Sequence, residues 1–326
     1  MPPKMRSRRR TRIEIVLRVL SFLALLLPAT AHAKLCGDDV QGRDVPCACG
    51  DTLVSSVVLT DDPVTTTVCP GDGLIVRPSG VVGITVDLNG QTIRGSNRGS
   101  GLWVLAGGAR VVSSRQPAHI EHFRDGVVAQ GDDPLRLVDN IVVSSMARDG
   151  VRVHGGNYTV NATDVIDVLH DGFALGGHDF LITATHATRS GRYGYFVMAT
   201  RGTIGVPGAG NTSQTSGDAG FSVTGMSVFM SDCTATGAAD TGMEISATNV
   251  ALEGCVATNN LKNGIVGDGG SWYLRSNQAV GNGYDGLVVR GLKAFDEGGN
   301  RGSENRGERW HRPAVQCSID GVPCAQ

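Results

Sequence analysis

The stretch ARDGVRVHGGN, residues 147–157, contains the unit that decides the fold. Asp149-Gly150 between apolar residues is a typical signal of a two-residue hairpin turn. The same pattern, however, recurs along the chain: a small or polar residue, then Gly, then apolar-x-apolar. Its glycines are Gly126, Gly150, Gly172, Gly194, Gly220, Gly242, Gly264 and Gly286, with gaps of 24, 22, 22, 26, 22, 22 and 22 residues. Such a period indicates a solenoid, in which each unit buries its apolar face only by stacking on the next.

Other columns of the repeat agree with a narrow coil. The residue after each glycine is apolar, and the positions seven and nine residues before it, from Gly150 onward, are small or uncharged. Alternation along a strand then turns the second and fourth residues after the glycine outward. Short strands without helical periodicity favour a parallel β-helix over a leucine-rich repeat, whose L-x-x-L-x-L units are absent. We expect Asn211, Asn277 and their column to satisfy buried backbone at a bend, and Asn300 and Asn305 to mark one last irregular coil.

Residues 1–33 are typical of a secretory signal, with a basic start, an apolar run at Val19–Leu27 and a small-x-small cleavage site at Ala31–Ala33. The apolar run is too short to span a membrane, and no second run of membrane length follows, so we expect no transmembrane segment in the mature chain. Removing residues 1–33 takes away 7 of 29 basic and 1 of 31 acidic residues, which leaves 22 against 30, a net charge of −8. A secreted or periplasmic acidic protein is a poor candidate for binding nucleic acid.

Eight cysteines in an exported chain indicate disulfides. Their grouping predicts the pairs Cys36–Cys47, Cys49–Cys69, Cys233–Cys255 and Cys317–Cys324. Equivalent residues of adjacent coils should lie about 4.8 Å apart, which is inside the Cα window of a disulfide for Cys233 and Cys255. The alternative for this pair is two free inward thiols, because stacked parallel side chains do not always reach a good torsion.

Three segments carry a family resemblance: CPGDGLIV (69–76), VDLNGQTIRG (86–95) and N-x-A-x-x-N-x-x-D-G-L (277–287). They resemble the right-handed parallel β-helix repeat proteins of the pectate-lyase-like superfamily over residues 49–305. The resemblance implies an all-β, right-handed parallel β-helix solenoid of about 22 residues per coil. It identifies the fold rather than the function, since the superfamily includes polysaccharide lyases, glycoside hydrolases, uronate epimerases, phage tailspikes and adhesins.

These observations predict a domain organisation in four parts. The signal over 1–33 is followed by a disulfide-rich N-terminal cap over 34–70 and by the β-helix over 71–305. A C-terminal tail over 306–326 is closed by the Cys317–Cys324 loop. Both ends of the solenoid are therefore expected to be stapled by disulfides.

The resemblance implies that carbohydrate binds to the sheet that follows the turn glycine. Arg152 and His154 point outward there, with Asp132, Asp133 and His178 on the turns of neighbouring coils. His is suited to proton transfer near neutral pH and Arg to holding a uronate carboxylate, which are the groups that a lyase or epimerase needs. Paired Asp132 and Asp133 would instead serve glycoside hydrolysis. The alternative is that all five are ordinary polar residues of surface turns.

Two further polar groups have simpler interpretations. A second outward cluster, most simply a row of surface ion pairs, consists of Glu244, Ser246, Asp268 and Arg290. The column Asp125, Asp149 and Asp171 would repel unless a cation such as Ca²⁺ lies between the carboxylates or each is bound into its turn.

The sequence leaves the choice between binding and catalysis open. Gly131-Asp132-Asp133 matches a fragment of the polygalacturonase pattern, but no Asn-Thr-Asp precedes it, and the Asp-Pro-His-Asp of alginate epimerases is absent. We therefore predict an exported protein that binds an extracellular polysaccharide or a cell-surface component without needing a cofactor. The alternative is a polysaccharide lyase, uronate epimerase or glycoside hydrolase that acts on an acidic glycan.

Overall fold

The structure, a computed structural model, describes residues 34–77, 83–105, 107–131, 135–307 and 313–324. The predicted signal over 1–33 lies outside the described residues. The chain divides into two units at Lys34, and the second, Leu35–Gln326, is the one described below. Within the described ranges, no helix is long and apolar enough to cross a membrane.

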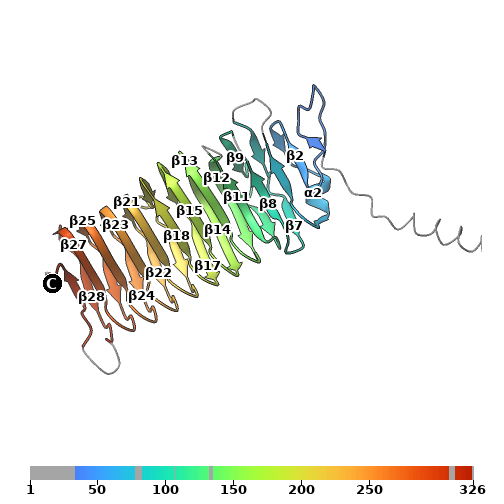
Figure 1. Ribbon diagram of the computed structural model, residues 1–326. Coiled ribbons are helices and arrows are strands. Elements are labelled where there is room, and N and C mark those ends of the chain that lie inside the picture. The colour runs from blue at the N-terminus through green and yellow to red at the C-terminus, as the bar shows by residue number, and fades with distance from the viewer. Residues whose placement is uncertain (1–33, 78–82, 106, 132–134, 308–312, 325–326) are drawn as a thin grey trace, which may run out of the picture. The chain divides into compact units, whose positions relative to one another are not determined.

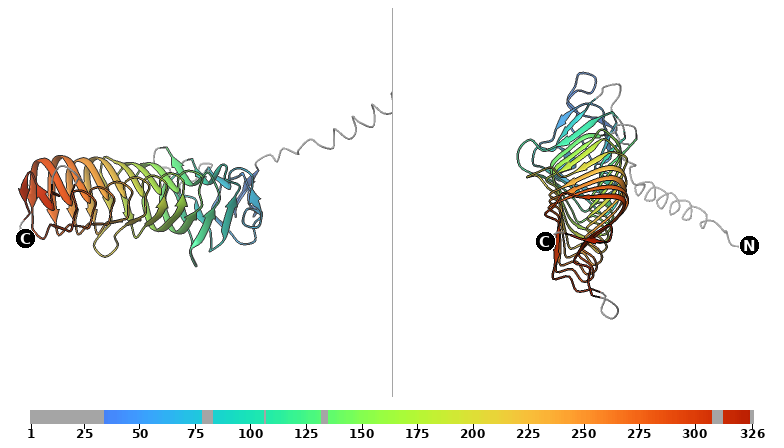
Figure 2. Two further views of the ribbon diagram at one scale, coloured as in Figure 1. Left: turned by 90° about the horizontal axis from the view of Figure 1, so that it is seen from below. Right: turned by 90° about the vertical axis from the view of Figure 1, so that its left-hand side faces the viewer.

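The second unit is an all-β solenoid whose coils stack in chain order, with parallel strands on three faces (Figures 1 and 2). We call the face that begins just after the turn glycine face A, and the next two along each coil faces B and C. The period and the parallel stacking predicted from the glycines are confirmed. Face A is also the sheet on which the outward residues Arg152 and His154 were predicted.

Nine of the described strands lie on face A alone. They are β1 (Leu35–Cys36), β2 (Asp51–Leu53), β5 (Leu74–Val76), β8 (Ser100–Val104), β11 (Asp125–Gln130), β13 (Val151–Gly156), β15 (Phe173–His178), β18 (Tyr195–Ala199) and β29 (Cys317–Ile319). Four longer strands continue from face A around the corner into face B: β21 (Phe221–Ser231), β23 (Met243–Glu253), β25 (Ile265–Arg275) and β27 (Leu287–Asp296).

Faces B and C complete the coils. The shorter strands of face B are β3 (Val57–Val58), β6 (Thr85–Asp87), β9 (Ala109–Val112), β16 (Phe180–Thr183) and β19 (Gly202–Ile204). Two strands run from face B into face C: β12 (Leu135–Ser144) and β14 (Thr159–Val168). The remaining strands of face C are β4 (Val68–Cys69), β7 (Thr92–Gly95), β10 (Ala118–Glu121), β17 (His186–Ser190), β20 (Thr212–Gln214), β22 (Thr234–Thr236), β24 (Val256–Thr258), β26 (Gln278–Val280) and β28 (Arg301–Ser303).

The two ends depart from the regular coil. The one-turn helix α2 (Pro63–Thr66) lies near the N-terminal end, and the carboxylate of Asp62 before it accepts the backbone N–H of Cys47 at 2.8 Å. At the C-terminal end β29 and β30 (Val322–Pro323) form an antiparallel pair, and β29 covers the free edge of β27. The boundary of the cap near residue 70 stays a prediction, since β2 already pairs in parallel with β5.

The turn glycines are required by the close approach of successive coils. A Cβ built on Gly150 would lie 2.6 Å from the carbonyl oxygen of Gly172, the equivalent glycine of the next coil, and would also overlap the side chain of Val165. The same contact recurs down the column, at 2.6 Å for Gly172 against the Gly194 oxygen. Asp149-Gly150 is therefore not a hairpin, and its glycine is selected by lack of space rather than by a left-handed backbone.

The core is built from the columns that the sequence predicts. The residue after each repeat glycine is fully buried at every coil: Val127, Val151, Phe173, Tyr195, Phe221, Met243, Ile265 and Leu287. Three of them form an aromatic stack in the middle of face A, with ring centroids 4.8 Å apart for Phe173 and Tyr195 and 4.4 Å apart for Tyr195 and Phe221. Each of these rings removes a large apolar area from water when it is buried.

An asparagine ladder satisfies the backbone at the corner before face C, as predicted. The Asn277 amide donates to the Leu252 carbonyl at 2.7 Å and to the Asn300 side-chain oxygen at 2.9 Å, and its own oxygen accepts the N–H of Cys255 at 2.9 Å. Asn305 continues a second ladder in the same way. Each fully buried amide thus links neighbouring coils.

Three of the four predicted disulfides are confirmed: Cys36–Cys47, Cys49–Cys69 and Cys317–Cys324. The prediction of Cys233–Cys255 is wrong, because both are free, buried thiols. They stand in the asparagine column and take over its role: the Cys233 thiol donates to the Ile204 carbonyl at 3.3 Å and the Cys255 thiol to the Glu253 carbonyl at 3.6 Å. Each thiol is directed at a backbone carbonyl, and the two side chains contact each other without a covalent bond. Burial also raises the pKa of Cys233, which keeps it an unreactive thiol.

We expect Gly150→Ala to lower the free energy of unfolding by about 1–3 kcal/mol, because the added methyl group overpacks the contact between two coils. Gly71→Ala is the matched control, since nothing lies within 4 Å of a Cβ built there. Chemical denaturation followed by circular dichroism measures both. Equal stability of the two variants would contradict the close-approach explanation of the repeat.

Candidate functional site

A pocket of about 400 Å³ opens on face A near the N-terminal coils. Its walls come from β8, β11 and β13 and from the turns that precede them. The lining consists of Asp72, Gly99, Ser100, Trp103, Arg124, Val128, Gln130, Arg148 and Arg152. The lining holds three arginines and one aspartate, and the exposed indole of Trp103 adds an apolar surface.

A buried carboxylate holds the three arginines in place. Asp125 is fully buried, and Arg148 binds it with two parallel bonds, Nε to Oδ1 at 2.7 Å and Nη2 to Oδ2 at 2.6 Å. Arg124 Nε donates to Oδ2 at 3.0 Å, and Arg152 Nη2 lies 3.2 Å from Oδ1. Bidentate guanidinium–carboxylate pairs are among the stronger and more directional interactions in proteins. Asp125 therefore orients the guanidinium groups, together with Asp149, whose carboxylate lies 3.5 Å from Nε of both Arg148 and Arg152.

The arginines keep hydrogen-bond donors for a ligand. A guanidinium has five N–H groups, of which Arg148 uses two on Asp125 and Arg124 uses one. Their side chains are 36% and 54% exposed, whereas that of Arg152 is only 26% exposed. Arg152 was predicted to face outward, and it does, but Asp125 and Asp149 restrain its guanidinium. Arg124 and Arg148 are therefore the more available anion ligands.

The charged network continues along the turns of the next coils. Asp149 accepts a hydrogen bond from His170 Nδ1 at 2.8 Å, and Asp171 lies 3.3 Å from the same nitrogen. His170 Nε2 lies 3.2 Å from Arg192 Nη1. Because a guanidinium can only donate, Nε2 accepts and the proton of the neutral imidazole is on Nδ1, facing the two carboxylates. The aspartate column predicted to need compensation is thus compensated by arginines and by a histidine N–H.

The same groups form a candidate metal site. Asp149, His170 and Asp171 offer ligand atoms that all lie within 4.8 Å of one another. Ca²⁺ prefers six to eight oxygen ligands, whereas this cluster offers one imidazole whose Nδ1 carries a proton in the arrangement above. The cluster therefore fits Ca²⁺ poorly, although the sequence left this cation open as one way to compensate the aspartate column.

His154 and His178 meet in a second pocket of about 400 Å³, at the other end of the same strands. Each imidazole lies over a glycine of the neighbouring coil. A Cβ built on Gly176 would come within 2.8 Å of His154 Nδ1, and one built on Gly156 would overlap the His178 ring. The two glycines thus make room for the two predicted histidines, whose side chains are exposed to solvent.

The remaining predicted site residues are not brought to this pocket by any described contact. Asp132 and Asp133 lie outside the described residues, next to Gly131, which lines the histidine pocket.

His178 is paired with a carboxylate. Its Nδ1 bonds Asp179 at 3.0 Å, and Asp179 also binds Arg201. Hydrogen bonds from Arg201 and His178 lower the pKa of Asp179, so this carboxylate is an ion-pair partner rather than a proton donor.

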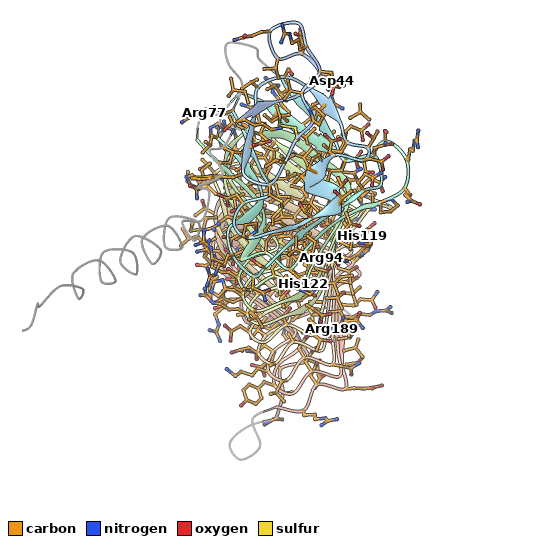
Figure 3. All side chains as sticks on the ribbon, turned by 90° about the vertical axis from the view of Figure 1, so that its right-hand side faces the viewer. Asp44, Arg77, Arg94, His119, His122 and Arg189 are labelled. Carbon is orange, nitrogen blue, oxygen red and sulfur yellow. A yellow bond between two sulfur atoms is a disulfide. The ribbon has the colours of Figure 1, made fainter. Side chains whose placement is uncertain are left out.

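Other charged residues form ordinary surface contacts. On face C, Arg94 and Arg189, which are labelled in Figure 3, pair one to one with Glu121 and Asp167. In the second predicted cluster, Asp268 lies beside Arg290 in register, as Ser246 does beside Asp268. No ion pair joins Asp268 to Arg290 within the described coils, and Glu244 is likewise exposed to solvent without a described ion pair. Neither group resembles the convergent arginines of face A.

The comparisons identify the fold family. A family model described as "Right handed beta helix region" matches residues 125–300, more than half of the chain. The protein therefore belongs to the right-handed β-helix family, which confirms the handedness and the repeat that the sequence predicts. Searches of curated proteins and of solved structures gave no significant match. The family defines the scaffold, and the function has to be argued from the site itself.

Sequence reasoning missed Arg124, Arg148 and Trp103. The signal is present in the column two residues before each glycine, which begins Arg124, Arg148, His170 and Arg192 and continues with Asp218, Asp240, Lys262 and Tyr284. A run of basic residues at one repeat position indicates a cationic stripe along the coils. Its convergence on a pocket depends on the buried Asp125, whose partners no single-coil pattern predicts.

We expect Asp171→Asn to gain stability relative to the parent as pH rises. Burial raises the pKa of Asp171 in the folded state, so the ionised folded form is disfavoured once pH exceeds the unfolded value of about 3.9. The gain should be absent below that pH and grow through the carboxyl range, measured by thermal unfolding between acidic and neutral pH.

Asp167→Asn is the control of opposite sign. A hydrogen bond from Arg189 lowers the pKa of Asp167, so its carboxylate stabilises the fold above the unfolded pKa and that contribution is lost as pH falls. The asparagine variant should therefore lose stability relative to the parent as pH rises. Parallel pH dependence in the two variants would contradict these assignments.

Proposed function

We propose that this protein is an exported carbohydrate-binding protein that holds an acidic polysaccharide on face A. The observation that carries the proposal is the pocket with Arg124, Arg148 and Arg152, oriented from behind by the buried Asp125. In this proposal, a uronate carboxylate accepts hydrogen bonds from those N–H groups of Arg124 and Arg148 that are not bound to Asp125. The face of its sugar ring packs on Trp103, as aromatic side chains commonly do in ligand sites.

The pocket is suited to binding because its donors are already ordered. Guanidinium groups fixed by buried carboxylates lose little rotamer freedom when a ligand arrives, so more of the interaction energy remains as affinity. A neutral sugar would not use the guanidinium charge. The pocket is therefore expected to discriminate by charge first and by sugar shape second.

Export is part of the proposal. Three disulfides at the two ends of the β-helix persist best in an oxidising compartment. The basic-apolar start of the sequence is the route we propose for reaching it. An extracellular polysaccharide or a cell-surface glycan is then the available ligand.

Calorimetric titration with an acidic oligosaccharide, such as one of galacturonate, and with its carboxyl-reduced neutral counterpart tests the proposal. We expect the neutral form to bind at least tenfold more weakly, which corresponds to about 1.4 kcal/mol. Arg124→Gln should weaken binding of the acidic form by a similar factor, since Arg148 still satisfies Asp125 and the fold is kept.

Arg201→Gln, which removes an exposed arginine of another ion pair, is the matched control and should leave binding unchanged. Equal affinity for the acidic and the neutral oligosaccharide would contradict a carboxylate-binding pocket. So would equal effects of the Arg124 and Arg201 substitutions.

A lyase or epimerase is the second candidate, favoured by the exposed His154 that follows Arg152 on β13. In a lyase, His154 would take the C5 proton of a uronate. The C5–H electrons would form the C4–C5 double bond, the C4–O bond would break, and the leaving oxygen would take a proton. An epimerase would return a proton to the other face of C5.

Incubation of the protein with the same acidic oligosaccharide distinguishes binding from turnover. Ultraviolet absorbance of an unsaturated uronate reports the lyase, and deuterium uptake at C5 from heavy water reports the epimerase. Either signal, if lost in His154→Gln with binding retained, would establish catalysis and assign His154. Binding without either signal supports the non-catalytic protein.

A further inference from the structure

Four residues that precede the strands of face A lie side by side on successive coils: Arg124, Arg148, His170 and Arg192. Backbone hydrogen bonds join each of them to the next, from the N–H of Arg148 at 2.7 Å, of His170 at 3.1 Å and of Arg192 at 3.0 Å. At about 4.8 Å per coil, the middle of the His170–Arg192 pair is about 10 Å from the middle of the Arg124–Arg148 pair, roughly the length of two sugars in an extended polysaccharide.

The imidazole of His170 is held at one end only. Its Nδ1 donates to Asp149 at 2.8 Å and lies 3.3 Å from Asp171. Its Nε2, at the other end of the ring, lies 3.2 Å from Arg192 Nη1 and accepts from it while the ring is neutral. The side chain is 41% exposed, so solvent can supply a second ring proton.

Arg192 is in position beside this nitrogen. Its guanidinium lies 4.5 Å above the Tyr193 ring, which favours a flat orientation of the group. Its Nε is 3.7 Å from the Asp218 carboxylate, which is longer than a hydrogen bond, and both side chains are exposed. Such a pair contributes little, so the guanidinium is available to another anion.

Protonation of His170 changes this contact into one between two cationic donors. Histidine is the side chain that changes charge between about pH 5 and 8. The charged groups next to the ring are Arg148 and Asp149 of the previous coil, Asp171 of its own coil and Arg192 of the next. The two carboxylates lie at the Nδ1 end and compensate the added charge there. At the Nε2 end, two donors 3.2 Å apart repel each other unless an anion accepts from both, as the two oxygens of a carboxylate can.

We propose that His170 and Arg192 form a second carboxylate subsite, which is filled together with protonation of His170. This inference rests on the proposed function, in which the first uronate occupies the pocket at Arg124 and Arg148. In a polysaccharide whose shape repeats every two sugars, the carboxylate two sugars further along points the same way. It accepts Nε2–H of His170 and Nη1–H of Arg192. Because the proton and the ligand favour each other, binding of such a chain takes up a proton and strengthens as pH falls through the histidine range.

Calorimetric titration with digalacturonate and tetragalacturonate at about pH 5.5 and about pH 7.5 tests the inference. The carboxyl groups of both ligands are ionised at both pH values, so a change in affinity reports on the protein. We expect the tetrasaccharide to bind at least tenfold more tightly at the lower pH. The disaccharide is too short to reach both subsites and should change by no more than about threefold, the effect of one added charge across about 7 Å of water.

Three variants assign this pH dependence. His170→Asn keeps an N–H for Asp149 but cannot ionise, so it should abolish the pH dependence of tetragalacturonate binding and leave digalacturonate binding unchanged. Arg192→Gln should weaken binding of the tetrasaccharide alone at the lower pH. His186→Asn is the matched control, because it removes an exposed histidine of face C, beside Asp164 in register, and should behave as the parent.

Titration of the parent near pH 7 in two buffers of different ionisation enthalpy measures the proton uptake, which is expected for the tetrasaccharide and not for the disaccharide. If the two ligands show equal pH dependence, or if His170→Asn retains that of the tetrasaccharide, the second subsite is wrong, and the proposed function stands where Arg124→Gln still weakens binding. If neither oligosaccharide binds the parent at either pH, both the function and the subsite are wrong.

Discussion

The contact on which the structure depends is the approach of each turn glycine to the carbonyl oxygen of the next one. A side chain at Gly150 would meet the Gly172 oxygen at 2.6 Å, so at this corner successive coils reach strand-pairing distance because the side chain is absent. Because the coils are stacked at this distance, equivalent positions of successive repeats line up in columns along the solenoid. Inward columns form the aromatic and asparagine stacks, and outward columns bring side chains of different coils into one surface.

The arginine pocket follows from this stacking. Asp125 and Asp149 are buried beside their turn glycines, where unpaired carboxylates would be costly. Arg124, Arg148 and Arg152 compensate them from their own coil and its neighbours, and in doing so become fixed with N–H groups left over. A structural requirement, the compensation of buried charge, thus produces an ordered anion-binding surface. On the C-terminal coils the corresponding positions are Asp218, Asp240, Lys262 and Tyr284, and the one basic residue among them, Lys262, pairs with Asp240.

The sequence predicts whatever depends on the period alone. The glycine spacing placed Val151 inside and Arg152 and His154 outside, and both placements are confirmed. It failed where the outcome depends on the rotamers of stacked side chains. Cys233 and Cys255 have the correct spacing for a disulfide, yet each thiol turns to a backbone carbonyl in place of an asparagine amide. The role of Arg148 is not predicted, because its bond to Asp125 of the previous coil is not encoded within one repeat.

The most direct test of the central claim is a crystal structure of the protein with a bound acidic oligosaccharide. We predict that a uronate carboxylate lies within hydrogen-bonding distance of the guanidinium groups of Arg124 and Arg148, with its sugar ring against Trp103. An oligosaccharide bound to face B or face C, or one that presents only hydroxyl groups to these arginines, would contradict the account.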